Sequence, residues 1–269
     1  RETVASPQKI LTLANKGVEV TAKNAPLLSR YLNDCIQLNY TAWGIRDSVS
    51  TLGWHGSEFV PYESTLCFDG IGDNRSLYNA FNSQCGTVSE WAEYVYPLIM
   101  KSPKLRLFMA ASFASPLIEK LGALPFVCHL FGMTGGGKTV ALMTALSVWG
   151  DPALGKTVRS LNMTQNAMLS TAAFLNSLPM AGDELQTIKT NVDNYDKLIM
   201  TLTEGVDRGR LTADSKMQTT RSWHCAFLFT GEEPISKANS GGGVKNRVIE
   251  VEAAENIVEN GVDIVRFLS

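Results

Sequence analysis

The stretch that most constrains this chain is Gly132–Thr139, whose sequence GMTGGGKT fits the phosphate-binding pattern G-x-x-x-x-G-K-[ST] at every fixed position. An apolar run of strand length, 126–131, precedes it. A helical stretch, 140–149, follows it and is closed by a glycine stop signal. Strand, glycine-rich loop and helix in this order are the context in which the pattern binds phosphate. The sequence therefore predicts a phosphate site where the first strand ends.

The residues of this loop have separate expected roles. Backbone N–H groups would turn inward around phosphate oxygens, and the helix N-terminus would add partial positive charge. Lys138 would reach the β and γ phosphates, and the Thr139 hydroxyl would ligate Mg²⁺. The alternative is a glycine-rich turn that precedes Lys-Thr by chance, and both flanks argue against it. The expected nucleotide contacts are Gly132, Thr134, Gly135, Gly136, Gly137, Lys138 and Thr139.

Composition limits the class of protein and its partners. The 269 residues are 45% hydrophobic and 19% charged, which suffices for one or two domains with a sizeable core. The net charge is -2, so a basic surface over the whole chain is excluded and any nucleic-acid contact needs a local patch. The five cysteines are odd in number and form no C-x-x-C pair, which predicts neither a zinc site nor a disulfide framework. We expect reduced thiols in a cytoplasmic protein.

Membrane and targeting signals are not visible in the sequence. The uncharged apolar stretch that ends at Ile118 is too short to span a bilayer and contains Pro116. The N-terminus has no signal-peptide pattern. We expect no membrane association. Because the sequence begins at Arg1 and stops soon after an apparent strand, we expect a fragment of a longer protein that lacks a C-terminal part.

Two portions are expected along the chain. Residues 1–100 read as a smaller N-terminal α+β domain, with helices over 7–17 and 26–39. Short apolar pieces over 41–68, broken by glycine and proline, predict a small antiparallel sheet. Residues 101–269 then read as a P-loop ATPase core, which is an α/β fold of the P-loop NTPase type with a parallel sheet.

A second motif lies 45 residues after Lys138, where a mostly apolar run ends in Asp183-Glu184. This is the composition of a Walker B strand. Asp183 would hold the Mg²⁺ shell, directly or through water. Glu184 would orient and polarise the attacking water. The alternative is a solvated strand end, because Ala181-Gly182 is less aliphatic than such a strand usually is and Pro179 breaks its start.

The segment 207–221 is locally basic, with four cations against two acids. Turn composition at its centre predicts a β-hairpin with a basic tip, and the alternative is a solvated loop. The candidate nucleic-acid contacts are Arg208, Arg210, Lys216 and Arg221.

A strongly apolar strand predicted over 223–229 ends at Thr230. A polar residue at the end of a strand beside the P-loop strand is placed to contact the γ-phosphate or its water, so Thr230 is a candidate sensor. His129 and His224 lie inside the two strands, and we expect core histidines rather than ligands.

Arg247 stands just before a strand predicted over 248–251. The preceding Ser-Gly-Gly-Gly, 240–243, predicts a flexible segment and no second phosphate loop. An arginine on a mobile loop could reach the γ-phosphate of a neighbouring subunit as an arginine finger. The alternative is a surface arginine that pairs with Glu250 or Glu252.

The order of these elements resembles one family, which is helicase-like and is catalogued as domain of unknown function nine-two-seven. Its members occur on bacterial mobile genetic elements and prophages, and the resemblance covers most of residues 11–252. The family is similar to AAA+ ATPases of the superfamily-3 and minichromosome-maintenance helicase type. The elements that carry the resemblance are the P-loop, Asp183-Glu184, Gly205 to Arg210, Trp223, Thr230-Gly231-Glu232 and Asn246-Arg247-Val248.

The resemblance implies a hexameric ring that hydrolyses ATP with Mg²⁺ at subunit interfaces and grips single-stranded DNA in its pore. By this resemblance Lys138, Thr139, Asp183 and Glu184 match the Walker positions, Thr230 matches sensor 1, Arg247 matches the finger, and 208–221 falls where a pore hairpin precedes the sensor strand. Two functions remain open. One is a motor on single-stranded or duplex DNA, and the other is an ATP-controlled oligomeric switch or scaffold that recruits replication or defence partners without translocating.

Overall fold

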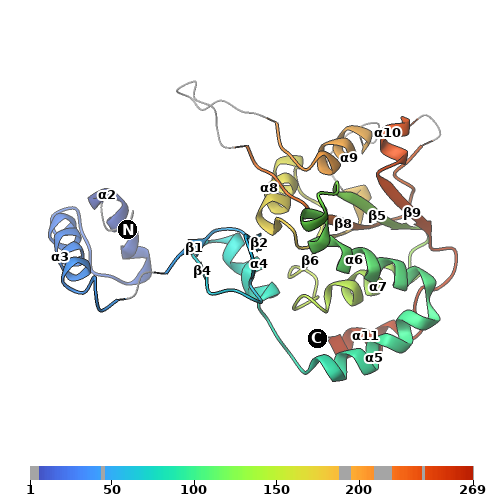
Figure 1. Cartoon of the computed structure of the whole chain (residues 1–269), viewed down its shortest axis with the longest axis horizontal. Coiled ribbons are helices and arrows are strands. Elements are labelled where there is room, and N and C mark those ends of the chain that lie inside the picture. Colours follow the sequence, from blue (N-terminus) through green and yellow to red (C-terminus); the bar gives the residue numbers. More distant parts are fainter. Residues whose placement is uncertain (1–5, 44–45, 188–194, 209–219, 238–239, 269) are drawn as a thin grey trace. The chain divides into compact units, whose positions relative to one another are not determined.

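The computed structural model describes residues 6–43, 46–187, 195–208, 220–237 and 240–268 (Figure 1). The chain forms two compact units, Arg1–Asp47 and Ser48–Ser269. In the first unit, α2 (Pro7–Ile10) continues into the 3-10 helix η1 (Leu11–Lys16), and α3 (Ala25–Leu38) follows. A small core that includes Ile10, Val20 and Ala25 joins these helices. The two helical stretches predicted from the sequence are confirmed.

The second unit is built on a five-stranded, all-parallel sheet with the strand order β6-β7-β8-β5-β9. Every residue of β8 is buried, as expected for a parallel strand that is covered on both faces. The strand that leads into the P-loop, β5, lies between β8 and β9. This α/β fold with a P-loop NTPase-like parallel sheet is the predicted one. The strands are β5 (Phe126–Phe131), β6 (Val158–Ser160), β7 (Met180–Asp183), β8 (Ala226–Gly231) and β9 (Val248–Glu252).

Helices alternate with these strands along the chain (Figure 1). The last helix lies beside α5 and α7, and its Phe267 ring stacks on Tyr94 of α5. Within the described ranges, no helix combines the length and apolar content needed to cross a membrane. The helices of this unit are α4 (Asp73–Phe81), α5 (Val88–Lys101), α6 (Pro103–Leu121), α7 (Lys138–Leu146), α8 (Gln165–Leu175), the 3-10 helix η2 (Leu185–Thr187), α9 (Tyr195–Glu204), α10 (Gly242–Lys245) and α11 (Gly261–Leu268).

The division between compact units falls at residue 47, whereas the sequence suggested a boundary at 100. Residues 48–100 pack on the sheet unit. The Leu52 amide donates to the Phe174 carbonyl at 2.8 Å, and Trp54 Nε1 donates to the Pro116 carbonyl at 2.8 Å. The Tyr62 hydroxyl donates to the carbonyl of Trp149. These contacts explain why this portion shares one core with the rest of the second unit.

The short strands of residues 48–68 differ in part from the expected antiparallel sheet. β2 (Gly53–His55) and β3 (Glu58–Val60) pair antiparallel, as predicted. β1 (Ser48–Val49) and β4 (Cys67–Phe68) pair in parallel, which was not predicted. The connection from β1 to β4 contains the β2–β3 hairpin, so β4 returns beside β1 in the same direction.

The glycine-rich segment before β9 also differs from its prediction. The sequence suggested a flexible stretch over 240–243, but Gly242–Lys245 forms the short helix α10. The Gly241 carbonyl accepts hydrogen bonds from the amides of Val244 and Lys245 at 3.1 and 3.3 Å. Val244 is buried, so an apolar anchor stabilises this turn despite its glycines.

Candidate nucleotide-binding site

The P-loop connects β5 to α7 and depends on the conformational freedom of its glycines. Gly132 and Gly137 have φ values of 137° and 79°, a region that residues with a Cβ rarely adopt. A Cβ on Gly132 would stand 3.0 Å from the Ala253 carbonyl oxygen. Lys138 begins α7, and its Nζ donates to the carbonyl oxygens of Gly132 and Met133 at 2.7 and 2.8 Å. The loop therefore holds the ammonium group at its own centre, where a bound phosphate would compete for it.

A cavity of about 280 Å³ opens beside this loop at the carboxyl ends of β5, β7 and β8. It contains most of the predicted site residues. Two predicted loop residues, Gly132 and Gly136, do not line it, and the Gly136 carbonyl accepts a hydrogen bond from the Ile257 amide at 3.0 Å. The lining residues are Thr134, Gly135, Gly137, Lys138, Thr139, Val140, Asp183, Glu184, Gln186, Thr230, Gly231 and Glu232.

Two hydroxyl groups, from α7 and β8, meet at one carboxylate of β7 in this cavity. The Thr139 hydroxyl donates to Asp183 Oδ2 at 3.0 Å and lies 3.2 Å from its Oδ1. The Thr230 hydroxyl also donates to the Asp183 carboxylate, and it accepts a hydrogen bond from the Glu184 amide at 3.2 Å. A hydroxyl and a carboxylate that converge beside a P-loop are suitable donors for Mg²⁺, which keeps several waters and needs only one or two carboxylates. The residues present thus fit the ion that the sequence predicts.

Asp183 reaches this place because β7 ends there, and the composition that weakened its prediction has a packing reason. A Cβ on Gly182 would overlap the Leu161 side chain, which is completely buried, so glycine suits the packing at this position. The next residue, Glu184, has a positive φ of 60°, which is uncommon for a residue with a side chain. Such backbone strain clusters at functional sites. Glu184 is exposed and lines the cavity.

Two cavity residues were missing from the predicted site, Glu232 and Gln186. Glu232 Oε1 accepts a hydrogen bond from the Thr134 hydroxyl of the P-loop at 3.0 Å. Gln186 lies in η2, three residues after Asp183. Glu232 follows the carboxyl end of β8, and Gln186 follows that of β7, the next strand in the sheet. Their positions just after strand ends were the sequence signal that could have indicated them. Their meeting in one cavity depends on strand order, which the sequence did not reveal.

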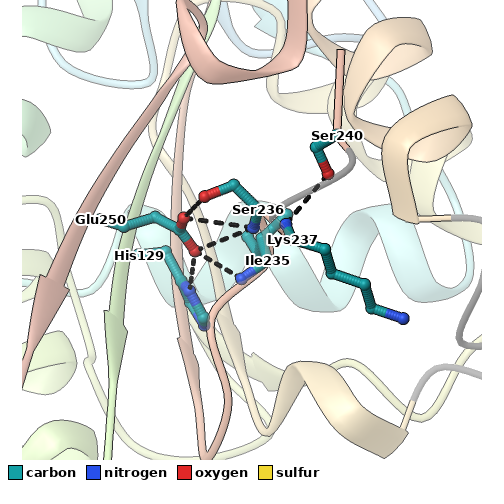
Figure 2. Close-up of polar contacts among 6 residues, drawn as sticks. All are labelled: His129, Ile235, Ser236, Lys237, Ser240 and Glu250. Carbon is teal, nitrogen blue, oxygen red and sulfur yellow. Dashed lines mark hydrogen bonds and ion pairs between the residues drawn. The ribbon is translucent and has the colours of Figure 1, made fainter.

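His129 forms a buried polar network behind the cavity with Glu250, its register partner on β9 (Figure 2). His129 Nδ1 lies 3.4 Å from Glu250 Oε1. The same carboxylate accepts hydrogen bonds from the amides of Ile235 and Ser236 and from the Ser236 hydroxyl. Farther along, Ser240 Oγ accepts from the Lys237 amide at 3.0 Å (Figure 2). Glu250 thus fixes the turn that follows β8.

Burial and hydrogen bonding set the charge states in this network. Burial lowers the pKa of His129, and the nearby Lys138 charge acts in the same direction, whereas Glu250 opposes both. Burial raises the pKa of Glu250, but the hydrogen bonds from His129 and Ser236 outweigh it and the net pKa is lowered. His129 is completely buried, as a core histidine should be. Its Nε2, however, has no hydrogen-bond partner in the described part of the chain.

Arg247 lies outside the cavity of its own chain. It stands just before β9, and its Nη1 lies 2.7 Å from Met200 Sδ of α9. Val248 pairs with Val127 near the start of β5, so Arg247 is at the end of the sheet opposite the P-loop. Glu250, one of its two expected salt-bridge partners, is instead occupied by His129 and the turn at Ser236.

The base of the expected basic hairpin is described, and its tip is not. Val206 and Ser222 form an antiparallel bridge, and the Asp207 amide donates to the Arg221 carbonyl at 2.8 Å. Arg221 Nε donates to Asp207 Oδ2 at 2.9 Å, and Nη2 donates to the same oxygen. Arg208 is exposed beside this pair. The predicted contacts Arg210 and Lys216 lie outside the described residues.

The parallel sheet and its P-loop define the class of this protein, an α/β protein with a P-loop NTPase-like fold. The chain belongs to the family described as Domain of unknown function (DUF927), whose model matches residues 3–222. This confirms the family that the sequence resembles. The matched span includes the P-loop and Asp183-Glu184 and ends before Thr230 and Arg247.

The solved structure "SCCmec type IV Cch - active helicase" has a similar fold, with a TM-score of 0.69 at 18% sequence identity. The match covers 99% of this chain and 51% of that chain, so the chain spans about half the length of the solved structure. At this identity the likeness shows the fold. Among curated proteins, none matches.

Proposed function

We propose that this chain binds ATP with Mg²⁺ in the P-loop cavity and is part of a ring-forming motor on single-stranded or duplex DNA, a helicase or translocase of a mobile genetic element. The observation that carries the proposal is the meeting of Thr139 and Thr230 at the Asp183 carboxylate, beside Lys138. A P-loop with this arrangement is suited to a nucleoside triphosphate and Mg²⁺. The family and the fold of the solved helicase are consistent with it.

Each residue of the cavity has a role in this proposal. The loop amides and Lys138 would bind the phosphates, and Thr139 and Asp183 would hold Mg²⁺, which neutralises phosphate charge when it is bound. Glu184, exposed at the cavity, would orient the attacking water and accept its proton. Thr230 would keep Asp183 and the Glu184 backbone in place through its two hydrogen bonds.

DNA contact and ring formation rest on residues at other places in the chain. The two ends of the segment 207–221 are paired antiparallel, as the base of the proposed hairpin would be. Arg208 at this base is exposed and available to a DNA phosphate. Arg247 would act on the nucleotide of a neighbouring subunit, in a homo-oligomer that we propose to be a hexamer.

One observation favours the alternative of an ATP-controlled oligomeric switch that recruits replication or defence partners without translocating. Arg221, one of the four cations proposed to hold DNA, is bound to the nearly buried Asp207. Its charge is therefore neutralised within the protein. A switch would bind and hydrolyse nucleotide without a response to DNA.

Nucleotide binding and DNA stimulation test the proposal in two steps. Calorimetry with ATP and Mg²⁺ should show binding that Lys138→Ala abolishes, because a charge-assisted phosphate contact is lost. Lys156→Ala, at an exposed lysine outside the cavity, is the matched control.

In the second step, ATP turnover of the full-length protein is measured with and without single-stranded DNA. Stimulation supports the motor, binding without DNA response supports the switch, and undiminished binding by Lys138→Ala contradicts both.

A further inference from the structure

His129 is a buried polar group that the proposed mechanism does not yet use. It lies in the middle of β5, the strand that leads into the P-loop, and is completely buried. The charged groups that act on its ring are Glu250 on β9 and Lys138 at the start of α7. Burial lowers its pKa, so the ring is neutral and carries one proton.

The position of that proton follows from the hydrogen bonds of Glu250. The carboxylate already accepts from the turn at Ile235 and Ser236, and it lies 3.4 Å from His129 Nδ1. An ionised carboxylate has no proton to donate, so Nδ1 carries the ring proton and donates. Nε2 is then a lone-pair acceptor, and it has no partner within the described residues. A buried acceptor without a donor is costly to a folded protein.

Nε2 lies close to Gly231, a glycine that lines the cavity. A Cβ at Gly231 would stand 2.9 Å from His129 Nε2 and 3.4 Å from Gln186 Oε1, so both side chains approach the same point. Gly231 and Gln186 both line the cavity. Because Gly231 has no side chain, nothing at this position separates the histidine nitrogen from the glutamine amide.

The Gln186 amide offers what Nε2 lacks. Its NH₂ end has two donors and its oxygen is an acceptor, and the two ends exchange places when the amide turns over. We propose that His129 is a positioning residue, whose Nε2 accepts a hydrogen bond from the Gln186 amide when nucleotide is bound and so turns the Gln186 oxygen towards the attacking water. This inference rests on the proposed nucleotide hydrolysis and assigns it a water-orienting side chain.

The chemical step is the ordinary one for a nucleoside triphosphate. The water oxygen bonds to the γ-phosphorus while the bond from that phosphorus to the leaving diphosphate oxygen breaks. The water proton passes to the Glu184 carboxylate. Gln186 accepts the second hydrogen of the same water, which fixes the direction of the attacking lone pair. Glu184 and Gln186 line the same cavity from positions two residues apart, so both can face one water.

Nitrogen NMR of the histidines tests the contact directly. The chain has three histidines, and the His129 signals are assigned by their loss in His129→Asn. Addition of a non-hydrolysable ATP analogue with Mg²⁺ should shift the Nε2 resonance in the direction of an accepted hydrogen bond. Gln186→Met, which has similar length and no donor, should remove this shift. Ser236→Ala is the control, because it removes a donor to Glu250 on the side away from Nε2 and should preserve the shift.

Turnover provides the second readout. Asn at position 129 can still donate to Glu250 but offers no acceptor at Nε2. His129→Asn and Gln186→Met should each lower turnover roughly tenfold to a hundredfold with nucleotide affinity unchanged, since a small misplacement of a reacting group can cost about 10²-fold. The double variant should be no slower than the slower single variant, because both act through one contact.

Two results would overturn the inference. One is nucleotide binding that leaves the Nε2 resonance unchanged, and the other is a shift that persists in Gln186→Met. If His129→Asn fails to fold, the His129 signals are assigned by elimination with His55→Asn and His224→Asn. The Gln186→Met spectrum then still decides, because His129 is intact in that variant. The spectra require only nucleotide binding. A lack of DNA stimulation would therefore contradict the proposed motor but not the contact between Gln186 and His129 Nε2.

Discussion

Thr230 and Asp183 are joined by a hydrogen bond from the threonine hydroxyl to the carboxylate, across the neighbouring strands β8 and β7. The same hydroxyl accepts from the Glu184 amide at 3.2 Å. One side chain at the end of β8 thus fixes both the proposed metal-binding carboxylate and the backbone that carries the proposed base. The proposed sensor residue and the proposed Walker B residues are in this way parts of one hydrogen-bonded unit.

We predict that Thr230→Val lowers ATP turnover by about ten- to a hundredfold with little change in nucleotide affinity. Valine keeps the shape of threonine but leaves the Glu184 amide and the Asp183 carboxylate without this partner. Thr203→Val is the matched control, because the buried Thr203 hydroxyl bonds only to carbonyls of its own helix α9. Steady-state kinetics measure the turnover, and calorimetry measures the nucleotide affinity. Equal turnover in Thr230→Val and Thr203→Val would count against the role of Thr230.

Glu232 should oppose nucleotide binding, because its carboxylate lies beside the P-loop and would face the negative phosphates. We predict that Glu232→Gln tightens ATP binding by up to about tenfold, since one charge a few ångströms away in a solvated site is worth about 1 kcal/mol. The amide can still accept from Thr134. Glu233→Gln changes the net charge equally at the adjacent exposed residue and should have a smaller effect. Equal affinities in the two variants would show that only net charge matters.

The features of this fold that could be predicted are those that depend on residues close together in the sequence. The strand 126–131 has the predicted bounds, because an apolar run followed by a glycine-rich loop is a local signal. The helix predicted over 140–149 instead starts at Lys138 and ends at Leu146. Its first turn is set by the positive φ of Gly137, and a pattern of apolar residues cannot show this.

The remaining features depend on contacts between distant segments. Gly182 looked unfavourable in a Walker B strand, and only the Leu161 side chain across the β6–β7 pair explains it. Glu232 and Gln186 reach the cavity because β8 lies between β7 and β5, which is a matter of strand order. The unit boundary at 47 instead of 100 follows from packing by Trp54 and its neighbours.

The two described arginines of the basic segment should behave differently. Arg208→Gln removes an exposed cation, so we predict little change in the free energy of unfolding. The plot of log affinity for single-stranded DNA against log salt concentration should have a slope smaller by about 0.7, because one phosphate contact is lost. Arg221→Gln removes the guanidinium that donates to the nearly buried Asp207 carboxylate, so it should lower the free energy of unfolding by on the order of 3 kcal/mol.

Chemical denaturation and salt titrations of DNA binding separate these two effects. The double variant Asp207→Asn with Arg221→Gln removes the buried charge as well, and it should regain part of the lost stability. If Arg221→Gln instead keeps full stability and reduces the salt slope as Arg208→Gln does, then Arg221 contacts DNA and its pairing with Asp207 is not structural.

The position of Arg247 determines how it could act on nucleotide. Val127 and Val248 are register partners, and the P-loop follows Phe131, four residues farther along β5. At about 3.3 Å per residue this separates the two ends of the sheet by roughly 13 Å. The guanidinium contacts Met200 Sδ of α9, and Arg247 does not line the cavity that contains Lys138. A finger role must therefore be exerted on another subunit.

We predict that Arg247→Ala lowers turnover of the full-length oligomer by about a thousandfold or more while ATP affinity stays nearly intact, because an arginine finger stabilises charge in the transition state. Arg266→Ala, at an exposed arginine on α11, is the control.

A mixing experiment tests whether Arg247 acts on another subunit. Arg247→Ala and Lys138→Ala subunits should each be inactive alone. In mixed rings, some interfaces join an intact P-loop to an intact arginine, so activity should partly return. An arginine with only a structural role predicts no recovery, because every Arg247→Ala subunit would remain impaired at its own site. A lack of recovery in rings shown to exchange subunits would therefore rule out the finger and leave Arg247 as a packing residue of α9.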